Sequence, residues 1–353
     1  MERAQHTARL IDAALGFMLD QSPQLIERRW QRTLRSLHVH EPRGASQREL
    51  LDDGNVDAYA LAHRLAFDAS NELSIFSCVR AARENARQVR EEISGEMWEC
   101  LNRLYLDVRE ARPALEGSTP GMTQVLGGRA QTMNSRNALQ TLDGKTQIFW
   151  RQPHEFFSRV QRSAFEFEGA TDATMRHEEG WLFIQIGRGL EQAAKTTALL
   201  NTYFSEPRSD AEETAIHEGN LKWTALLKSC AAFEPYCRAY SPSISPNDIA
   251  QFLLLDATFP RSVRASALRI ETALHSIARA TRRDVPPSAT NHFGDTAQWK
   301  LTRLAGRLKA QLDYAVFSGV MEDGLSPFLN TIQEECVRIH YAIYHVYIGY
   351  MAE

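Results

Sequence analysis

Three landmarks of this sequence occur twice, in the same order. They are a run that opens with glutamate, a Trp-x-x-x-Leu-x-Ser pattern, and a serine that follows an apolar-Asp-Ala triplet, at Glu2 and Glu191, Trp30 and Trp223, and Ser74 and Ser262. The copies lie 189, 193 and 188 residues apart. A repeat of this kind indicates two copies of one supersecondary unit that pack against each other. We therefore predict two helical halves related by a pseudo-twofold axis.

The segment between the two copies suggests where the halves are joined. Proline and glycine cluster from 112 to 129, which marks the best candidate for a linker. We place the first helical repeat in residues 1–150, a connection at 151–164 and the second repeat at 165–353. A chain of 353 residues is long enough for one large core or two modest ones.

Apolar residues recur at helical spacing, which predicts an all-α, multi-helix bundle. One stripe with steps of four, three, four and four indicates a helix from about 75 to 106, and its members are Ala82, Ala86, Val89, Ile93 and Met97. A second long helix is expected at 175–204, interrupted by two glycines. Evidence for a strand is confined to the alternating residues 164–168, which are too few to assign.

Charge and composition exclude several classes of protein. Forty basic against 44 acidic residues leave a net charge of −4, so no overall cationic field favours nucleic acid. No apolar run exceeds five residues, far short of the roughly 20 that span a bilayer. The five cysteines form no Cys-x-x-Cys pair, and the histidines lack metal-ligand spacing, so we expect reduced thiols in the cytoplasm and no metal. No phosphate-binding loop or other cofactor motif is present.

The densest charged pattern runs from 80 to 94. On a helix, one face would carry Arg80, Arg83, Glu84, Arg87, Arg90, Glu91 and Ser94. Guanidinium groups stacked in this way suit the binding of carboxylate or phosphate. The competing interpretation is a solvated face of Glu-Arg pairs, each of which stabilises the helix by about 0.2–0.5 kcal/mol.

A second candidate constellation combines Glu2-Arg3 with Arg188 and Glu191. Gly187 and Gly189 flank Arg188 and leave room for close helix packing or for a ligand, although surface ion pairs are the alternative. Asp68 and Asp256 are expected to cap helix N-termini rather than to anchor loops.

These landmarks resemble the bacterial Alpha-E family, an all-helical domain named for a Glu-Arg motif. The resemblance covers nearly the whole chain. It rests on Glu2-Arg3-Ala4-x-x-Thr7-Ala8-Arg9-Leu10, on 82–102 with Ala82-Arg83-Glu84-Asn85-Ala86-Arg87-x-Val89-Arg90, on Thr174-Met175-Arg176-x-x-Glu179-Gly180-Trp181, on Gly187-Arg188-x-Leu190-Glu191, and on Phe259-Pro260-Arg261-Ser262.

The resemblance implies a function in amide chemistry. Proteins of that family are encoded with, and sometimes fused to, circularly permuted ATP-grasp proteins, alongside transglutaminase-like proteins. An ATP-grasp enzyme joins a carboxylate to an amine, so the expected role is that of an accessory or substrate-binding protein for such a ligase. We hypothesise a groove between the halves that binds an anionic peptide or small carboxylate. Its expected ligand-binding residues are Glu2, Arg3, Arg83, Asn85, Arg87, Arg90 and Arg188.

Two other classes of function stay open. In the first, the chain is itself an enzyme that uses Glu84 or Glu191 as a general acid or base. In the second, it is a non-catalytic helical scaffold, whose charges would be scattered and individually paired.

The sequence departs from the family pattern twice. Gln192 stands where the second Glu-Arg motif would have arginine, which argues against two equivalent sites. The first copy also lacks a counterpart of Arg188, since Met1 directly precedes Glu2. We expect either a misplaced start or a genuine loss.

Overall fold

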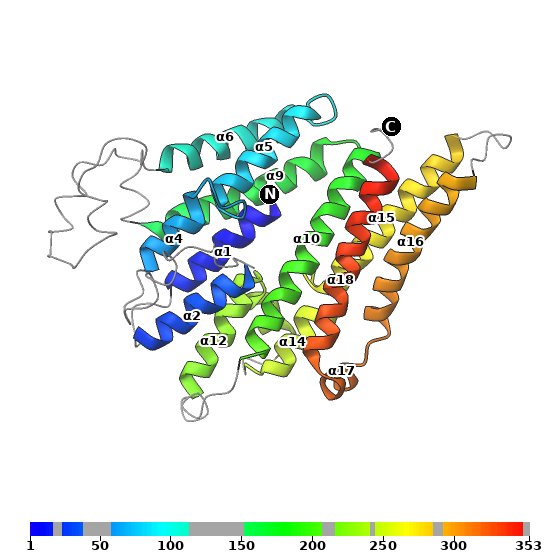
Figure 1. Cartoon of the computed structure of the whole chain (residues 1–353). Helices are drawn as coiled ribbons and strands as arrows, with labels where there is room; N and C mark the ends of the chain where they lie inside the picture. The colour runs from blue at the N-terminus through cyan, green and yellow to red at the C-terminus, as the bar shows by residue number, and fades with distance from the viewer. Residues whose placement is uncertain are drawn as a thin grey trace.

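The computed structural model describes residues 1–16, 23–37, 58–112, 152–206, 216–240, 244–284 and 292–348, and within these ranges it contains helices and no strand (Figure 1). The all-α prediction is confirmed. The helices are α1 (Glu2–Gly16), α2 (Pro23–Ser36), α4 (Ala58–Phe67), α5 (Ile75–Gln88), α6 (Gly95–Ala111), α9 (Pro153–Thr174), α10 (Glu179–Phe204), α12 (Ile216–Ser229), α13 (Phe233–Ala239), α14 (Pro246–Leu255), α15 (Val263–Asp284), α16 (His292–Asp313), α17 (Phe317–Asp323), α18 (Leu325–Ile343) and the π-helical turn η1 (Tyr344–Ile348).

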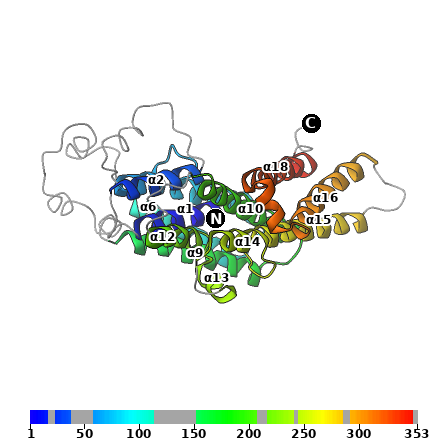
Figure 2. The same cartoon turned by 90° about the horizontal axis from the view of Figure 1, so that it is seen from below.

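Helix α10 lies in the middle of the molecule. Figure 1 shows α1, α2, α4, α5, α6 and α9 on one side of it and α15, α16 and α18 on the other. The view from below gives the same arrangement (Figure 2). Helix α10 packs against α15 and α18 on one side and against α1 and α2 on the other. One continuous apolar core therefore extends across α10, from Trp30 and Phe67 to Ile270 and Leu329.

Serine side chains start several of these helices. Ser74 accepts a hydrogen bond from the backbone N–H of Ser77 at 3.1 Å, and Ser262 accepts one from that of Ala265 at 3.0 Å. Ser94 caps α6 in the same way, through the N–H of Met97 at 3.2 Å. Each serine satisfies a donor that the first helical turn leaves without a partner.

The prediction of one helix from 75 to 106 is wrong, because the chain turns between α5 and α6. Helix α5 ends at Gln88, and Ser94 begins α6 as its N-cap. The apolar stripe had suggested continuity because Ala82, Val89 and Met97 face the same space from both sides of the turn. The expected second helix is shorter than predicted, since α10 begins at Glu179, and residues 164–168 lie inside helix α9.

The repeated landmarks occupy matching places along the chain. Trp30 lies in α2 and Trp223 in α12, and the two capping serines precede α5 and α15. Asp68 and Asp256 follow α4 and α14, where their carboxylates accept hydrogen bonds from the backbone N–H two residues later. They anchor loops, so the prediction that they cap helix N-termini is wrong. The pseudo-twofold axis itself stays a prediction.

Helix α9 crosses the predicted boundary between the halves. It runs without a break from Pro153 to Thr174 and packs against α1 and α6. A division at 164/165 would cut this helix. Its whole length lies with α1 and α6, on the side of the first predicted half. Of the predicted linker at 112–129, residues 113–129 lie outside the described residues.

Candidate functional site

A groove of about 620 Å³ lies where α5 and α6 face α1, α9 and α10. Its apolar wall comes largely from the stripe identified in the sequence, with Ala82 and Ala86 of α5, Ile93 of the turn and Met97 of α6. Its polar floor carries Glu2, Glu168 and Arg188, and Arg3 and Glu191 lie at its rim. The groove thus combines an apolar wall with a floor of ionisable groups.

Small residues keep this space open. Alanines occupy the α5 side of the groove, and a Cβ atom added at Gly187 of α10 would meet no other atom within 4 Å. Gly189 has a different role, because a Cβ there would come within 2.7 Å of the Ile270 side chain. Of the two glycines beside Arg188, one lines the groove and the other permits close packing of α10 on α15.

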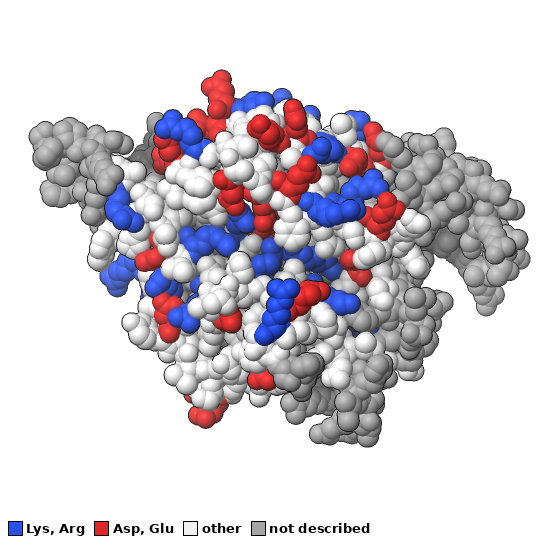
Figure 3. Space-filling model, turned by 180° about the vertical axis from the view of Figure 1, so that it is seen from behind, with Lys and Arg blue, Asp and Glu red and all other residues white. Residues whose placement is uncertain are grey.

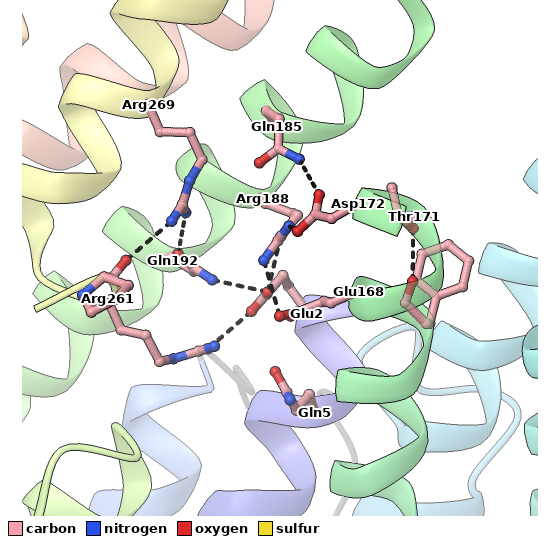
Figure 4. Close-up of polar contacts among 12 residues, drawn as sticks. Glu2, Gln5, Glu168, Thr171, Asp172, Gln185, Arg188, Gln192, Arg261 and Arg269 are labelled. Atoms are coloured by element: carbon pink, nitrogen blue, oxygen red, sulfur yellow. Dashed lines mark hydrogen bonds and ion pairs between the residues drawn. The ribbon is translucent and has the colours of Figure 1, made fainter. Parts of the chain in front are cut away.

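The carboxylate of Glu2 is the centre of a buried polar network (Figure 4). Gln192 donates a hydrogen bond to one of its oxygens at 2.9 Å, and Arg261 donates to the other at 3.0 Å. Arg188 lies 3.9 Å from Glu2 and donates to Glu168 at 2.9 Å. Helices α1, α9 and α10 and the loop before α15 therefore meet at one glutamate.

Glu2 and Glu168 have pKa values on opposite sides of the ordinary value. Burial alone would raise the pKa of Glu2, but the charge of Arg261 and hydrogen bonds from Glu168 and Gln192 outweigh it and lower that pKa to about 2. Burial and the neighbouring Glu2 raise the pKa of Glu168 to about 7. Two close carboxyl groups cannot both ionise freely, so the pair retains one proton near neutral pH.

Gln192 links this network to α15. Its amide nitrogen donates to Glu2, while its carbonyl oxygen accepts from Arg269 at 2.7 Å. Arg269 also donates to the backbone carbonyl of Pro260 at 3.2 Å. An arginine at 192 would offer only donors and would place another cation beside Arg269, whereas glutamine supplies the acceptor that this position needs.

At the rim of the groove, Arg3 binds Glu191. Its Nε and Nη2 atoms donate to one carboxylate oxygen of Glu191 at 2.7 and 2.5 Å. The Arg3 side chain is 54% exposed, so this pair is open to water and to solutes. Asn85, on α5, lines the same groove. The structure therefore brings together Glu2, Arg3, Asn85, Arg188 and Glu191 of the predicted site.

The arginine face of α5 does not join them. Arg83 donates to Asn102 at 2.6 Å and lies over the rings of Trp98 and Tyr105, and Arg90 also lies over Trp98. These contacts hold the guanidinium groups on the α6 side, away from the groove lining. The expectation that Arg83 and Arg90 line the groove is wrong, because α5 turns its alanines and Asn85 toward the space.

Arg87 and Glu84 form an exposed ion pair with each other at 2.7 Å, one helical turn apart. The hydrogen bond from Arg87 lowers the pKa of Glu84, which is the opposite of what a general acid needs. Neither residue lines the groove, so their positions match the solvated-face interpretation, and the predicted ligand-binding and catalytic roles stay predictions.

Sequence reasoning missed four residues of the network, namely Glu168, Asp172, Arg261 and Arg269. Asp172 accepts hydrogen bonds from Trp181 at 3.0 Å and Gln185 at 3.1 Å and lies 3.7 Å from Arg188. Arg261 was visible as part of the Phe-Pro-Arg-Ser motif, although nothing in that motif indicates Glu2 as its partner. Glu168 carried no signal, because its segment showed only a weak alternation.

Charged side chains of both signs are interspersed over the back of the molecule (Figure 3). Within the described ranges, no group of three metal-binding side chains is arranged to hold an ion. None of the helices in these ranges is long and apolar enough to cross a membrane.

Comparison with known proteins finds relatives in mycobacteria. The uncharacterized proteins Mb2597 of Mycobacterium bovis and MT2643 of Mycobacterium tuberculosis are each 23% identical over 225 residues, which are 64% of this chain and 21% of the relative. Rv2567 of Mycobacterium tuberculosis is 31% identical over 121 residues, or 34% of this chain and 12% of that protein. The chain thus matches about a fifth or less of the length of these relatives. No solved structure matches it.

A family model described as a predicted alpha-helical domain with a conserved Glu-Arg motif matches residues 1–348. The match begins beside Glu2-Arg3, two residues whose side chains line the groove. This chain belongs to the Alpha-E family.

Proposed function

We propose that this chain is an accessory, substrate-binding protein of an ATP-grasp-dependent system that forms amide or peptide bonds. Its groove holds a peptide-like substrate that carries a carboxylate. The observation that carries the proposal is the groove itself, which offers an apolar wall for side chains and an ion-paired floor for polar ends. At about 620 Å³ it lies within the size range of small-molecule and peptide sites.

The Arg3–Glu191 pair is the point at which a substrate carboxylate enters. An exposed ion pair contributes at most about 1 kcal/mol, so a ligand carboxylate competes for the Arg3 guanidinium at little cost. Arg188 is different, because its side chain is only 17% exposed and is held by Glu168. Arg3 therefore binds the ligand, and Arg188 maintains the floor.

The partnership with an ATP-grasp ligase is supported by the resemblance to the Alpha-E family described above. It also fits the length of the relatives, in which the matched stretch is part of a much longer chain. We place the system in the cytoplasm, and the five free cysteines support a reducing compartment.

The test uses two leucine substitutions on one helix. Ala82→Leu adds bulk to the groove wall, whereas Arg87→Leu puts the same side chain on the exposed face of α5. Each variant is purified with the ATP-grasp protein encoded beside it, and ADP release is measured with an amine and a carboxylate substrate. We expect wild type and Arg87→Leu to support the ligase and Ala82→Leu to reduce ADP release at least tenfold.

Equal ADP release with both variants would contradict the proposal, as would recovery of the chain without a ligase under native conditions. Circular dichroism of Ala82→Leu controls for loss of fold.

The second candidate, an enzyme in its own right, is favoured by one observation. The carboxyl pair of Glu2 and Glu168 borders the groove and retains a proton near neutral pH, as a general acid requires. In that case Glu168→Gln abolishes turnover of a peptide by the isolated chain and leaves peptide binding intact. A chain with no turnover of its own excludes this candidate.

A further inference from the structure

A second, smaller cavity lies behind the groove floor. Its volume is about 10 Å³, and it shares Glu2 and Glu191 with the groove. Its other polar lining includes His6 of α1, Lys195 of α10 and Arg261 of the loop before α15. This volume corresponds to about one water-sized occupant.

The carboxylates at this cavity are already neutralised. Glu2 binds Arg261 at 3.0 Å, and Glu191 binds Arg3 at 2.5 Å. Lys195 makes no hydrogen bond or ion pair within the part of the chain that the structure describes. Its amine thus contacts no anion directly, although the charge of Glu191 acts on it, and burial lowers the pKa of the amine.

Arg9 is a second cation near the cavity, and its guanidinium lies over the Phe165 ring at 5.2 Å from the ring centroid. Its side chain is 4% exposed, and both of its terminal nitrogens lack a hydrogen-bond partner among the described residues. Burial lowers the pKa of Arg9 to about 9. The charge of Arg9 acts on His6 and Cys230, which both line the cavity.

His6 is a buried imidazole on which the charges of three cationic side chains act. The residue is 6% exposed, and its Nε2 atom has no hydrogen-bond partner in the described structure. Burial and the charges of Lys195, Arg9 and Arg261 together lower its pKa well below the ordinary value. In the neutral tautomer that carries its proton on Nε2, the imidazole can donate a hydrogen bond to a small anion.

We propose that this cavity is a binding site for one small anion, held by Lys195 and His6 and stabilised by the nearby charge of Arg9. The cavity has room for one atom, which would be either a halide ion or one oxygen of a carboxylate. The site is distinct from the groove and does not depend on the proposed function. Burying unmatched cations costs free energy, and a bound anion offsets that cost.

The experiment measures thermal unfolding at constant ionic strength while sodium gluconate is replaced by chloride, bromide or acetate. Gluconate is the reference salt because the hydroxyl-bearing chain next to its carboxylate hinders the approach of that group to the cavity. We expect Tm to rise saturably by about 2 °C or more with an anion that enters. Lys195→Met should unfold at a higher temperature than wild type in gluconate and should lose the rise. Lys309→Met is the matched control, because Lys309 pairs with Asp313 on α16 and should keep the rise.

Crystals grown in bromide give a readout that needs no variant. An anomalous peak beside Lys195 and His6 supports the proposal. A larger rise in Tm with acetate than with chloride identifies carboxylate as the preferred source, and the reverse identifies halide. The proposal is overturned if Tm is the same in all salts and no bromide peak appears, or if Lys195→Met keeps the full rise.

Discussion

At the scale of single residues, Glu2 shows how a carboxylate is kept charged inside a helical protein. It is buried, but Arg261 and Gln192 each give it a hydrogen bond, and Arg188 lies within 4 Å. The loss of one partner from such a network leaves the remaining charges buried without a counter-charge. The free-energy cost of that state exceeds the net stabilisation that the intact network provided.

Glu2→Ala should therefore lower the free energy of unfolding by about 3–5 kcal/mol, because Arg261 and Arg188 would lose their shared anion. Glu84→Ala is the matched control, since Glu84 is exposed and pairs only with Arg87 on its own helix. Its effect should stay within about 0.5 kcal/mol. Urea unfolding followed by circular dichroism measures both, and equal effects would show that the Glu2 network is not a stabilising unit.

Glu168 makes stability depend on pH. Its pKa is about 7 in the folded protein against an ordinary value of 4.5, so between these values the folded state holds a proton that the unfolded state has released. The contribution of Glu168 to stability is present below pH 4.5 and is lost as pH rises to 7. Glu168→Gln, which imitates the protonated form, should flatten this decline.

Urea unfolding at pH 5, 6, 7 and 8 checks this, with Glu166→Gln on the same helix as control. Glu166 is half exposed and pairs with Arg103. If both variants decline with pH as steeply as wild type, Glu168 does not carry the dependence.

The site could be predicted from sequence only in part, for a reason that lies at this scale. Glu2 and Glu191 open the two repeated runs, and Arg3 and Arg188 stand close to them in the sequence, so their gathering at one site could be predicted. Arg83 and Arg87 also stand in a motif, but which side of a helix faces a groove depends on its partners. Glu168 acquires its role from contacts with Glu2 and Arg188, which are distant in sequence.

At the scale of helices, the two glycines that flank Arg188 in α10 have opposite functions. Gly189 lies where a Cβ would come within 2.7 Å of Ile270 and 3.0 Å of the backbone oxygen of Ser266, so α15 would have to shift. Gly187 has free space on its side of the helix. A glycine in a helix costs about 1 kcal/mol relative to alanine, and only Gly189 gains close packing in return.

We expect Gly189→Ala to destabilise the protein by about 1–3 kcal/mol through overpacking, and Gly187→Ala to stabilise it by up to about 1 kcal/mol. Gly187→Ala should also weaken ligand binding, since its methyl group enters the groove. Chemical unfolding of the two variants decides the matter, and a Gly189→Ala protein as stable as wild type would mean that α10 and α15 are not in close contact.

The helices themselves were largely predictable, because apolar spacing and capping serines are local features. The break between α5 and α6 was not, although Ser94 and Gly95 are a helix-start signature. Val89 and Ile93 of the turn contact the same groove as Ala82 and Met97, so tertiary packing produced a stripe that imitates one long helix.

At the scale of the whole molecule, the helices of the predicted halves are interleaved. Helix α2 packs against α10, and α12 packs against α1. Glu206, after α10, binds Arg32 of α2 at 2.9 Å and Lys222 of α12 at 3.2 Å. A cut between the halves would expose both apolar and charged surfaces that are buried in the intact chain.

The intact protein should therefore unfold in one cooperative transition, and residues 1–150 alone should not fold. That fragment lacks α9, α10 and α12, which cover most of the surface of α1, and the core that extends across α10 would be open to water. Calorimetry of the whole chain, comparing the van't Hoff with the calorimetric enthalpy, tests the first expectation, and circular dichroism of the fragment tests the second. Two separate transitions, or a helical fragment with its own sharp melting curve, would show instead that the repeat consists of two independent domains.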